Sequence, residues 1–262
     1  MAARRTEALI LRSVDFGESD RIFHLLVPEV GRLTAIAKGA RRSVKRFGGT
    51  LDLFNHLQVQ LEQRRSGAMS RLDQAVLIHH FAPIRSHPAR FGLGCYLLEL
   101  LDRLAPEGGN RGDMRRLFDF ALRALEVLAE HEPDSSLRTV LELRILDALG
   151  LRPELRRCVG CGREPGSRAE VDFHVPDGGP VCVACAARRT GCIRIHLGTL
   201  RALEQSLRLD VSRLDRLVLS PAALEEARHL VSRFQRFHVG VELQSERFLE
   251  RMLAPPRAGG PS

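Results

Sequence analysis

Four cysteines form two C-x2-C pairs, Cys158/Cys161 and Cys182/Cys185, with twenty residues between the pairs. Each pair spans a short turn that brings two thiolates to the same side, and two such pairs complete a tetrahedral zinc site. Four thiolates leave no open coordination position, so a site of this kind stabilises a fold and does not activate water. The spacing therefore predicts one structural Zn²⁺ per chain, held by these four cysteines.

Two disulfides are the alternative use of these cysteines. Met1–Arg5 is basic, but the apolar run Ala8–Leu11 is too short for a signal peptide. We therefore expect a cytoplasmic protein, in which paired C-x2-C motifs hold metals more often than disulfides. Cys95 lies in an apolar stretch and is expected in the core. Three further side chains could replace one ligand: Cys192, His174 and His196.

A second group of residues with chemical potential is basic. The segment Lys38–Arg46 contains five positive charges and no negative one. Residues 32–71 carry nine basic and two acidic side chains, an excess close to the net charge of +8 of the whole chain. Such a loop attracts phosphates, with an affinity that falls as salt rises. The predicted DNA-binding residues are Lys38, Arg41, Arg42, Lys45, Arg46, Arg32, Arg64, Arg65 and Arg71.

A solvated surface loop is the alternative interpretation of this charge. Only Lys38 and Lys45 are lysines, and an arginine excess of this kind reflects genomic base composition more than function. Base stacking has little support, because the chain has no Trp and its only Tyr, Tyr96, lies in a predicted helix. The predicted barrel contains five phenylalanines, several of which must fill its core: Phe16, Phe23, Phe47, Phe54 and Phe81. Contacts with the phosphate backbone should therefore dominate.

Catalytic templates do not fit this chain. A Walker A loop needs Lys directly after Gly, but the two lysines follow Ala37 and Val44. The zinc-protease and deaminase patterns and the G-x-S-x-G elbow are also absent from the sequence. His79-His80 and Glu225-Glu226 are expected to be surface or barrel-edge polar residues. We therefore expect no enzyme activity.

The elements that must position these residues change character along the chain. Residues 57–62 alternate apolar and polar side chains, and four other short aliphatic segments precede or follow them: Ala8–Val14, Ile22–Val27, Leu33–Ala37 and Leu72–Ile78. Five short strands favour a small closed barrel, and the five-stranded OB-fold is the commonest one that handles nucleic acid. The basic segment would then be a loop on this barrel.

From Pro88 onward, apolar residues recur at helical spacing. The predicted helices cover residues 96–104, 117–128, 137–149, 197–207, 221–236 and 245–253, and no apolar run is long enough to span a membrane. The predicted fold class is α+β. The expected organisation is an OB-fold DNA-binding domain (1–80), a helical domain in two parts (81–154 and 193–253), an inserted four-cysteine zinc module (155–192) and a disordered tail (254–262).

Several local strings resemble the RecO family of bacterial DNA-repair proteins. They are Glu18-Ser19-Asp20 before Ile22–Leu26, Gly31 followed by Ala37-Lys38-Gly39-Ala40-Arg41-Arg42, His238-Val239-Gly240, and Ser245-Glu246-Arg247-Phe248-Leu249. The resemblance covers the chain except the tail after Leu253. It implies an OB-fold, a helical domain and a zinc module whose cysteines some members have lost.

The resemblance also implies a function, that of a recombination mediator. Such proteins bind single- and double-stranded DNA and anneal complementary strands. With RecR, they load RecA onto DNA coated by single-strand-binding protein. A member of this family would act in the cytoplasm at the nucleoid, and Lys38, Arg41 and Arg42 are the DNA contacts that the resemblance carries over.

Other functions remain open on the sequence. The basic loop could bind an acidic protein in an interaction scaffold that does not use DNA. Alternatively, the four-cysteine module could be the DNA reader of a sequence-specific regulator, because arginines surround it: Arg152, Arg156, Arg157, Arg163 and Arg168. A strong preference for one duplex sequence would favour the regulator. An enzyme of unfamiliar type is the third alternative.

Overall fold

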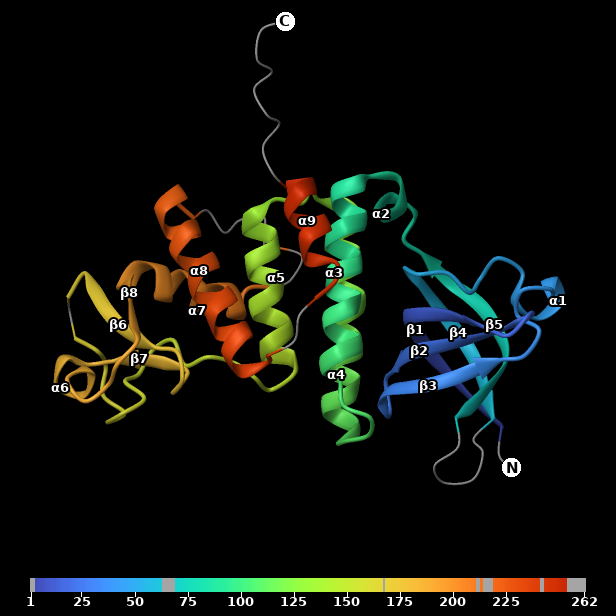
Figure 1. Ribbon diagram of the computed structural model, residues 1–262, viewed down its shortest axis with the longest axis horizontal. Coiled ribbons are helices and arrows are strands. Elements are labelled where there is room, and N and C mark those ends of the chain that lie inside the picture. Colours follow the sequence, from blue (N-terminus) through green and yellow to red (C-terminus); the bar gives the residue numbers. More distant parts are fainter. Residues whose placement is uncertain are drawn as a thin grey trace, which may run out of the picture.

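The structure is a computed structural model that describes residues 3–62, 69–166, 168–210, 213, 219–240 and 243–253. A β-barrel lies at one end, helices fill the middle and a small sheet lies at the other end (Figure 1). The α+β class and the N-terminal five-stranded sheet agree with the sequence prediction. The tail 254–262 and two of the predicted DNA-binding residues, Arg64 and Arg65, lie outside the described residues.

The N-terminal sheet closes into a barrel with strand order β1-β2-β3-β5-β4. Its strands are β1 (Ala3–Phe16), β2 (Asp20–Val27), β3 (Gly31–Ala37), β4 (Asn55–Glu62) and β5 (Ser70–His80). All neighbours pair antiparallel except β3 and β5, which meet in parallel over a short stretch beginning at Ala35 and Ser70. The predicted alternation in β4 is confirmed, because every second residue from Asn55 onward is buried.

Seven helices of the described chain form the middle of the molecule. They are α2 (Ala82–Ser86), α3 (Pro88–Leu104), α4 (Arg111–Glu130), α5 (Ser135–Ala148), α7 (Leu197–Arg208), α8 (Pro221–His238) and α9 (Glu246–Leu253). Side chains at the N-caps of α4, α5 and α8 accept backbone N–H bonds: Asn110, Asp134 and Ser220. None of the described helices combines the length and the apolar character needed to cross a membrane.

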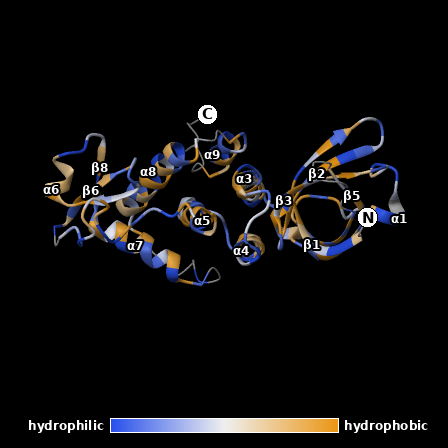
Figure 2. Cartoon of the chain, turned by 90° about the horizontal axis from the view of Figure 1, so that it is seen from below, coloured by the Kyte–Doolittle hydropathy of each residue, from blue (hydrophilic) through white to orange (hydrophobic). Residues whose placement is uncertain are grey.

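Helix α5 is enclosed by other helices, with α3 and α4 on one side and α7 and α8 on the other (Figure 2). Even its charged residues Arg138, Glu142 and Arg144 are buried. Arg138 Nε donates to Glu142 Oε1 at 2.8 Å, and Arg144 donates to backbone carbonyls near the end of α7. A buried charge is costly unless it is paired, so these contacts are required once the helix is enclosed.

The barrel has an interior core of its own, and a second hydrophobic core joins one end of the barrel to the helices. Leu9, Leu26 and Phe54 of the barrel end pack with apolar residues of α3 and α4. A Cβ atom added at Gly94 of α3 would lie 2.7 Å from Cε1 of Phe54, so the ring rests directly on the helix backbone. Polar contacts surround this core, since Asp102 of α3 accepts a hydrogen bond from the His24 ring at 2.6 Å. The barrel is therefore rigidly seated on α3.

Helix α9 returns the end of the described chain to α3. The Glu99 carboxylate accepts the backbone N–H groups of Gln244 and Ser245, both at 2.9 Å. Burial by itself would raise the pKa of Glu99, but these donors and the Ser245 hydroxyl lower it below its ordinary value. The predicted helix over 245–253 is therefore anchored by an acidic cap that belongs to a distant helix.

The other end of the molecule carries a three-stranded antiparallel sheet of order β7-β6-β8. The strands are β6 (Glu170–His174), β7 (Gly179–Val181) and β8 (Cys192–His196). The short helix α6 (Val183–Ala186) lies between β7 and β8 in the chain. The buried face of this sheet, with Phe173 and Ile195, packs in one core with Leu203 of α7 and Leu230 of α8. The sheet therefore depends on these two helices for its hydrophobic support.

We predict that Gly94→Ala destabilises the protein. The added methyl group would press on the buried Phe54 ring and on Ile84 Cγ2, 3.1 Å away, so the free energy of unfolding should fall by about 1–3 kcal/mol. The matched control is Gly198→Ala in α7, where the new Cβ meets open space and a gain of up to about 1 kcal/mol is expected. Urea denaturation measures both. Wild-type stability in Gly94→Ala would show that the junction can relax.

Candidate metal centre and nucleic-acid interface

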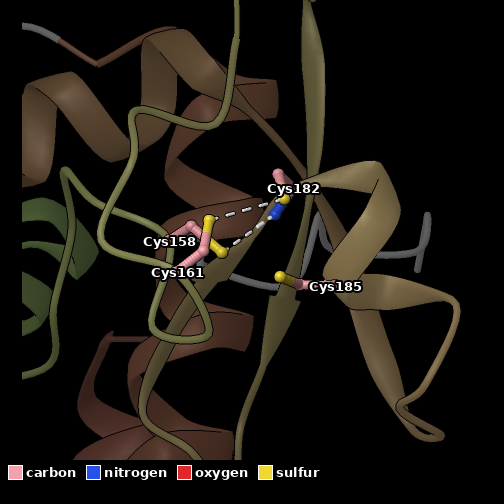
Figure 3. Close-up of side chains that lie close together, drawn as sticks. All are labelled: Cys158, Cys161, Cys182 and Cys185. Atoms are coloured by element: carbon pink, nitrogen blue, oxygen red, sulfur yellow. Dashed lines mark hydrogen bonds between the residues drawn. The ribbon is translucent and has the colours of Figure 1, made fainter.

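The four cysteines of the two C-x2-C pairs come together at one point (Figure 3). All four Sγ atoms lie within 4.8 Å of one another, and those of Cys161 and Cys182 are 3.9 Å apart. In a tetrahedral site with Zn–S bonds of about 2.3 Å, the sulfur atoms lie about 3.8 Å apart. The arrangement therefore fits a zinc ion, and it unites the four residues that the sequence selected.

The first C-x2-C pair forms a turn that only small residues allow. The backbone N–H of Cys158 donates to the carbonyl of Arg163 at 2.7 Å, and Gly162 closes the turn with φ +74°. A Cβ atom at Gly160 would lie 3.0 Å from the Cys185 Sγ atom. Glycine at this position therefore lets the two pairs approach closely enough to share one metal ion.

The second pair is placed by the small sheet. Cys182 follows β7 directly, and its carbonyl accepts the N–H groups of Cys185 at 2.9 Å and Ala186 at 2.8 Å, which starts helix α6. The N–H of Val159 donates to the carbonyl of Pro180 at 2.9 Å and so ties the first pair to β7. Backbone hydrogen bonds therefore hold the two pairs in register.

Electrostatics in this group favour a bound cation. Burial alone would raise the pKa of Cys158, but the backbone N–H groups of Cys182, Gly160 and Cys161 hold it at about 6. The N–H of Cys182 lies 3.3 Å from the Cys158 Sγ atom. Hydrogen bonds with the sulfur atoms of Cys182 and Cys158 raise the pKa of Cys185 to about 12. Without a metal the group therefore keeps a proton on Cys185, and a dication such as zinc would displace that proton and neutralise the thiolates.

The possible substitute ligands lie outside this group. Cys192 is paired with His174 across β6 and β8. The ring of His174 accepts the N–H of Asp177 at 3.2 Å, and the ring of His196 is hydrogen-bonded to Glu226. Cys95 lies in α3 as expected, where burial raises its pKa to about 11. Among the described residues the metal group thus consists of sulfur alone, which suits a closed structural site.

The basic segment Lys38–Arg46 lies at the end of the barrel farthest from the helical middle (Figure 1). It follows β3 and ends within helix α1 (Val44–Phe47). Its backbone is anchored to the β1–β2 turn, since Gly39 N donates to Asp20 Oδ1 at 2.8 Å and Arg41 N to the carbonyl of Ser19 at 3.1 Å. The segment is therefore an ordered loop, as the sequence suggested.

The charges of this loop differ in their availability. Lys38, Arg41, Arg42 and Lys45 are exposed, whereas Arg46 is half-buried. Arg46 donates to the carbonyl of Lys38 at 2.5 Å and so connects the two ends of the loop. Lys38 is 3.5 Å from Asp20 and Arg41 is 3.8 Å from Asp15, both long ion pairs. Arg42 and Lys45 have no ion pair with any described residue, so the loop presents cations outward.

The remaining predicted DNA contacts do not join the loop as one cluster. Arg71 pairs with Ile36 in the barrel register, near the start of the loop, but its guanidinium is 2.8 Å from Asp73. Arg32 lies near the opposite end of β3, where it contacts Glu107 at 2.5 Å and Asp102 at 3.5 Å. Arg32 therefore belongs to the junction between the barrel and the helices.

Sequence reasoning missed an exposed apolar strip near this surface. Of the five barrel phenylalanines only Phe16 is exposed, at 53%; Phe23 and Phe47 fill the barrel core as expected, whereas Phe54 and Phe81 lie in the core shared with the helices. On β5, Val76, Leu77 and Ile78 are all exposed in a row, although an alternating strand would bury every second one. The cause is topological, because β3 pairs with β5 only around Ser70. The unbroken apolar run 75–78 was the available signal.

The polar pairs noted in the sequence have structural partners. The His79 ring packs edge-on against Phe81, with centroids 4.5 Å apart, and the His80 ring is 2.8 Å from the side-chain oxygen of Asn55. Glu226 accepts from Thr199 at 2.6 Å. These contacts give structural roles to His79, His80 and Glu226, whereas Glu225 is exposed.

Comparison with known proteins places these features in a family. Two family models match the chain: Recombination protein O N terminal over residues 1–81 and Recombination protein O C terminal over residues 85–247. A DNA repair protein RecO from Anaeromyxobacter dehalogenans strain 2CP-1 is 32% identical over 96% of this chain and 98% of its own length. The protein of the same name from Myxococcus xanthus is 34% identical over 94% of this chain and 96% of its own length. The one from Symbiobacterium thermophilum is 31% identical over 96% of this chain and 98% of its own length.

We predict that Cys158→Ser removes the metal and destabilises the protein. Loss of one thiolate opens the tetrahedral shell, so the zinc content should fall from about one ion per chain and the unfolding free energy by at least about 3 kcal/mol. Cys192→Ser is the control, since that thiol lies outside the group. Elemental analysis and urea denaturation measure the two effects. A metal-free variant with wild-type stability would contradict a structural zinc site.

We predict that Gly160→Ala weakens metal binding without removing a ligand. The new methyl group would meet the Cys185 Sγ and Cβ atoms at 3.0 and 3.1 Å and would push the two C-x2-C pairs apart. Zinc affinity should fall by about 10-fold or more in competition with a chromogenic chelator. Gly198→Ala serves as the control. An unchanged affinity would mean that close approach of the two pairs is not required.

Proposed function

The chain belongs to the recombination protein O family, and on that premise we propose that it acts in DNA repair as a recombination mediator. In this role it binds DNA, anneals complementary strands and, together with RecR, helps load RecA onto single-stranded DNA coated by single-strand-binding protein. Its place would be the cytoplasm, at the nucleoid. No covalent step is required, and the zinc ion serves the fold.

The barrel is proposed to be an OB-fold. Strand β1 pairs with both β2 and β4, and the closed order β1-β2-β3-β5-β4 is that of a five-stranded Greek-key barrel. We divide the chain accordingly into an OB-fold domain (1–80), a helical domain (81–154 and 193–253) and an inserted zinc module (155–192). The barrel provides a rigid frame for the DNA-contacting loop.

The observation that carries the proposal is the outward charge of the Lys38–Arg46 loop. Four of its five cations are exposed, and two of these have no described carboxylate partner. The long ion pairs of Lys38 and Arg41 are weak because Arg41, its partner Asp15 and the amine of Lys38 are solvent-exposed. Little interaction energy is therefore lost when a phosphate replaces these carboxylates.

Phosphate contacts explain annealing without catalysis. Two complementary strands repel each other through their phosphates, and a cationic surface lowers this repulsion while it releases bound counterions. The near absence of exposed aromatic residues on the barrel supports backbone contact over base stacking, since only Phe16 is available there. Binding would therefore be indifferent to sequence, and partner proteins would supply the choice of location.

The nine predicted residues contribute unequally under this proposal. Lys38, Arg41, Arg42 and Lys45 would make the phosphate contacts, while Arg46 holds the loop in shape. Arg71 lies beside the loop and would add a weaker contact, because Asp73 already engages it. Arg32 would contribute least, since two carboxylates at the junction with the helices hold it.

We predict that the triple substitution Lys38→Glu, Arg42→Glu and Lys45→Glu abolishes most DNA affinity. Reversing three contacts should weaken binding of a labelled single strand by at least about 100-fold at moderate salt and reduce the salt slope by about 2. Fluorescence anisotropy at several salt concentrations measures both quantities. Thermal stability should stay within error, because these side chains lie outside the core.

The control applies the same change of charge elsewhere. Arg103→Glu, Arg111→Glu and Arg123→Glu lie on exposed positions of α3 and α4. Equal loss of affinity in this variant would show that net charge, and not the loop, governs binding. An unaltered affinity in the loop variant would move the DNA site elsewhere. Absence of any DNA binding by the wild-type protein would favour the scaffold that binds an acidic protein.

A further inference from the structure

The zinc module carries a second set of exposed cations. Arg156 and Arg157 precede the first C-x2-C pair, Arg163 follows it, and Arg188 follows the second pair. All four side chains are exposed. We infer that these four residues, here called the module arginines, form a second site for nucleic-acid phosphates. The inference rests on the proposed DNA function of the barrel loop, to which it adds a separate binding surface.

The four cysteines lie between the chain segments that carry the module arginines. Cys158 lies between Arg157 and Arg163, and its N–H donates to the carbonyl of Arg163 at 2.7 Å. Arg188 is one turn beyond Cys185, whose Sγ lies within 4.8 Å of the other three ligands. The four cysteines therefore bring together chain segments that carry arginines up to 32 positions apart in the sequence, from 156 to 188.

The module arginines have no described ion pair, whereas three neighbouring arginines each have at least one. Arg189 is 2.6 Å from Asp177, and Arg152 is 2.5 Å from Glu204. Arg194 lies 3.8 Å from Glu170. These neighbours are already engaged by carboxylates and are therefore less available to a phosphate.

A carboxylate close to the module arginines, that of Glu154, is already hydrogen-bonded to the backbone. The Glu154 carboxylate accepts the N–H groups of Arg156 and Arg157 at 2.7 and 3.0 Å. Burial opposes ionisation of Glu154, but these donors lower its pKa. Glu154 thus shapes the turn from which the two side chains project. A zinc ion with four thiolates carries a charge of about −2, but that charge lies at the centre while the long guanidinium side chains extend into solvent.

The two basic surfaces lie at opposite ends of the molecule. Figure 1 shows the sheet β6–β8 with α6 at one end and the barrel loop with α1 at the other, with α3, α4 and α5 between them. Phosphates bound at one surface do not compete for the other. One chain can therefore hold two nucleic-acid segments at once, and a second segment held this way has a raised effective concentration relative to the first.

The test compares binding of one strand with binding of two. Arg156→Gln, Arg157→Gln, Arg163→Gln and Arg188→Gln are combined, and zinc content and melting temperature verify the fold. Donor- and acceptor-labelled oligothymidylates, which cannot pair, report by energy transfer when one protein holds both. Sedimentation gives the number of chains per complex. The control carries Gln at four exposed helical arginines: Arg103, Arg111, Arg123 and Arg201.

We expect the module variant to bind the first strand within about twofold of wild type and to lose the two-strand complex by at least about 10-fold. The control should keep that complex. Wild-type energy transfer in the module variant would overturn the inference while leaving the barrel site intact. Wild-type protein that binds no strand would overturn the proposed function as well. Tighter binding of polyglutamate than of oligothymidylate at the module would assign the arginines to an acidic protein and overturn it too.

Discussion

The arrangement of the whole molecule depends on helix α5, which belongs to two hydrophobic cores. Val140, Leu141 and Ile145 pack with α3, α4 and the barrel end, whereas Leu143 and Leu146 pack with α7, α8 and the small sheet. A helix that buries every side has no face left for solvent, so its charged residues must find partners inside the protein. Because α5 belongs to both cores, it links the barrel to the small sheet beside the four cysteines.

The helical middle leaves the two ends of the molecule free to display charged side chains. At one end a loop anchored by backbone hydrogen bonds to the β1–β2 turn displays cations, and at the other end a metal group shapes two turns from which arginines project. Both ends take their local shape from turns and hydrogen bonds, and the helices position them and also give the small sheet its hydrophobic support. Function under our proposal is therefore a matter of presenting charge to nucleic-acid phosphates.

Arginine has several different roles in this chain. Arg144 is buried and satisfies backbone carbonyls, Arg32 ties the barrel to the helices, and Arg42 has no described carboxylate partner. In a protein with 40 basic residues, composition alone cannot separate these roles. What separates them is the number of carboxylates and carbonyls that the fold places within reach.

Local pattern in the sequence determined the four-cysteine group, the alternation of β4 and the order of strands before helices, because each of these depends mainly on residues close together in the chain. The family followed from short strings, and the long segments of helical periodicity appeared where predicted. Tertiary structure alone decided that α5 is enclosed, that Arg32 and Arg71 are engaged by acids, and that Val76, Leu77 and Ile78 stay exposed. These outcomes depend on which elements, distant in the sequence, pack beside these residues in the fold. Packing between distant segments leaves no periodic signal in the sequence.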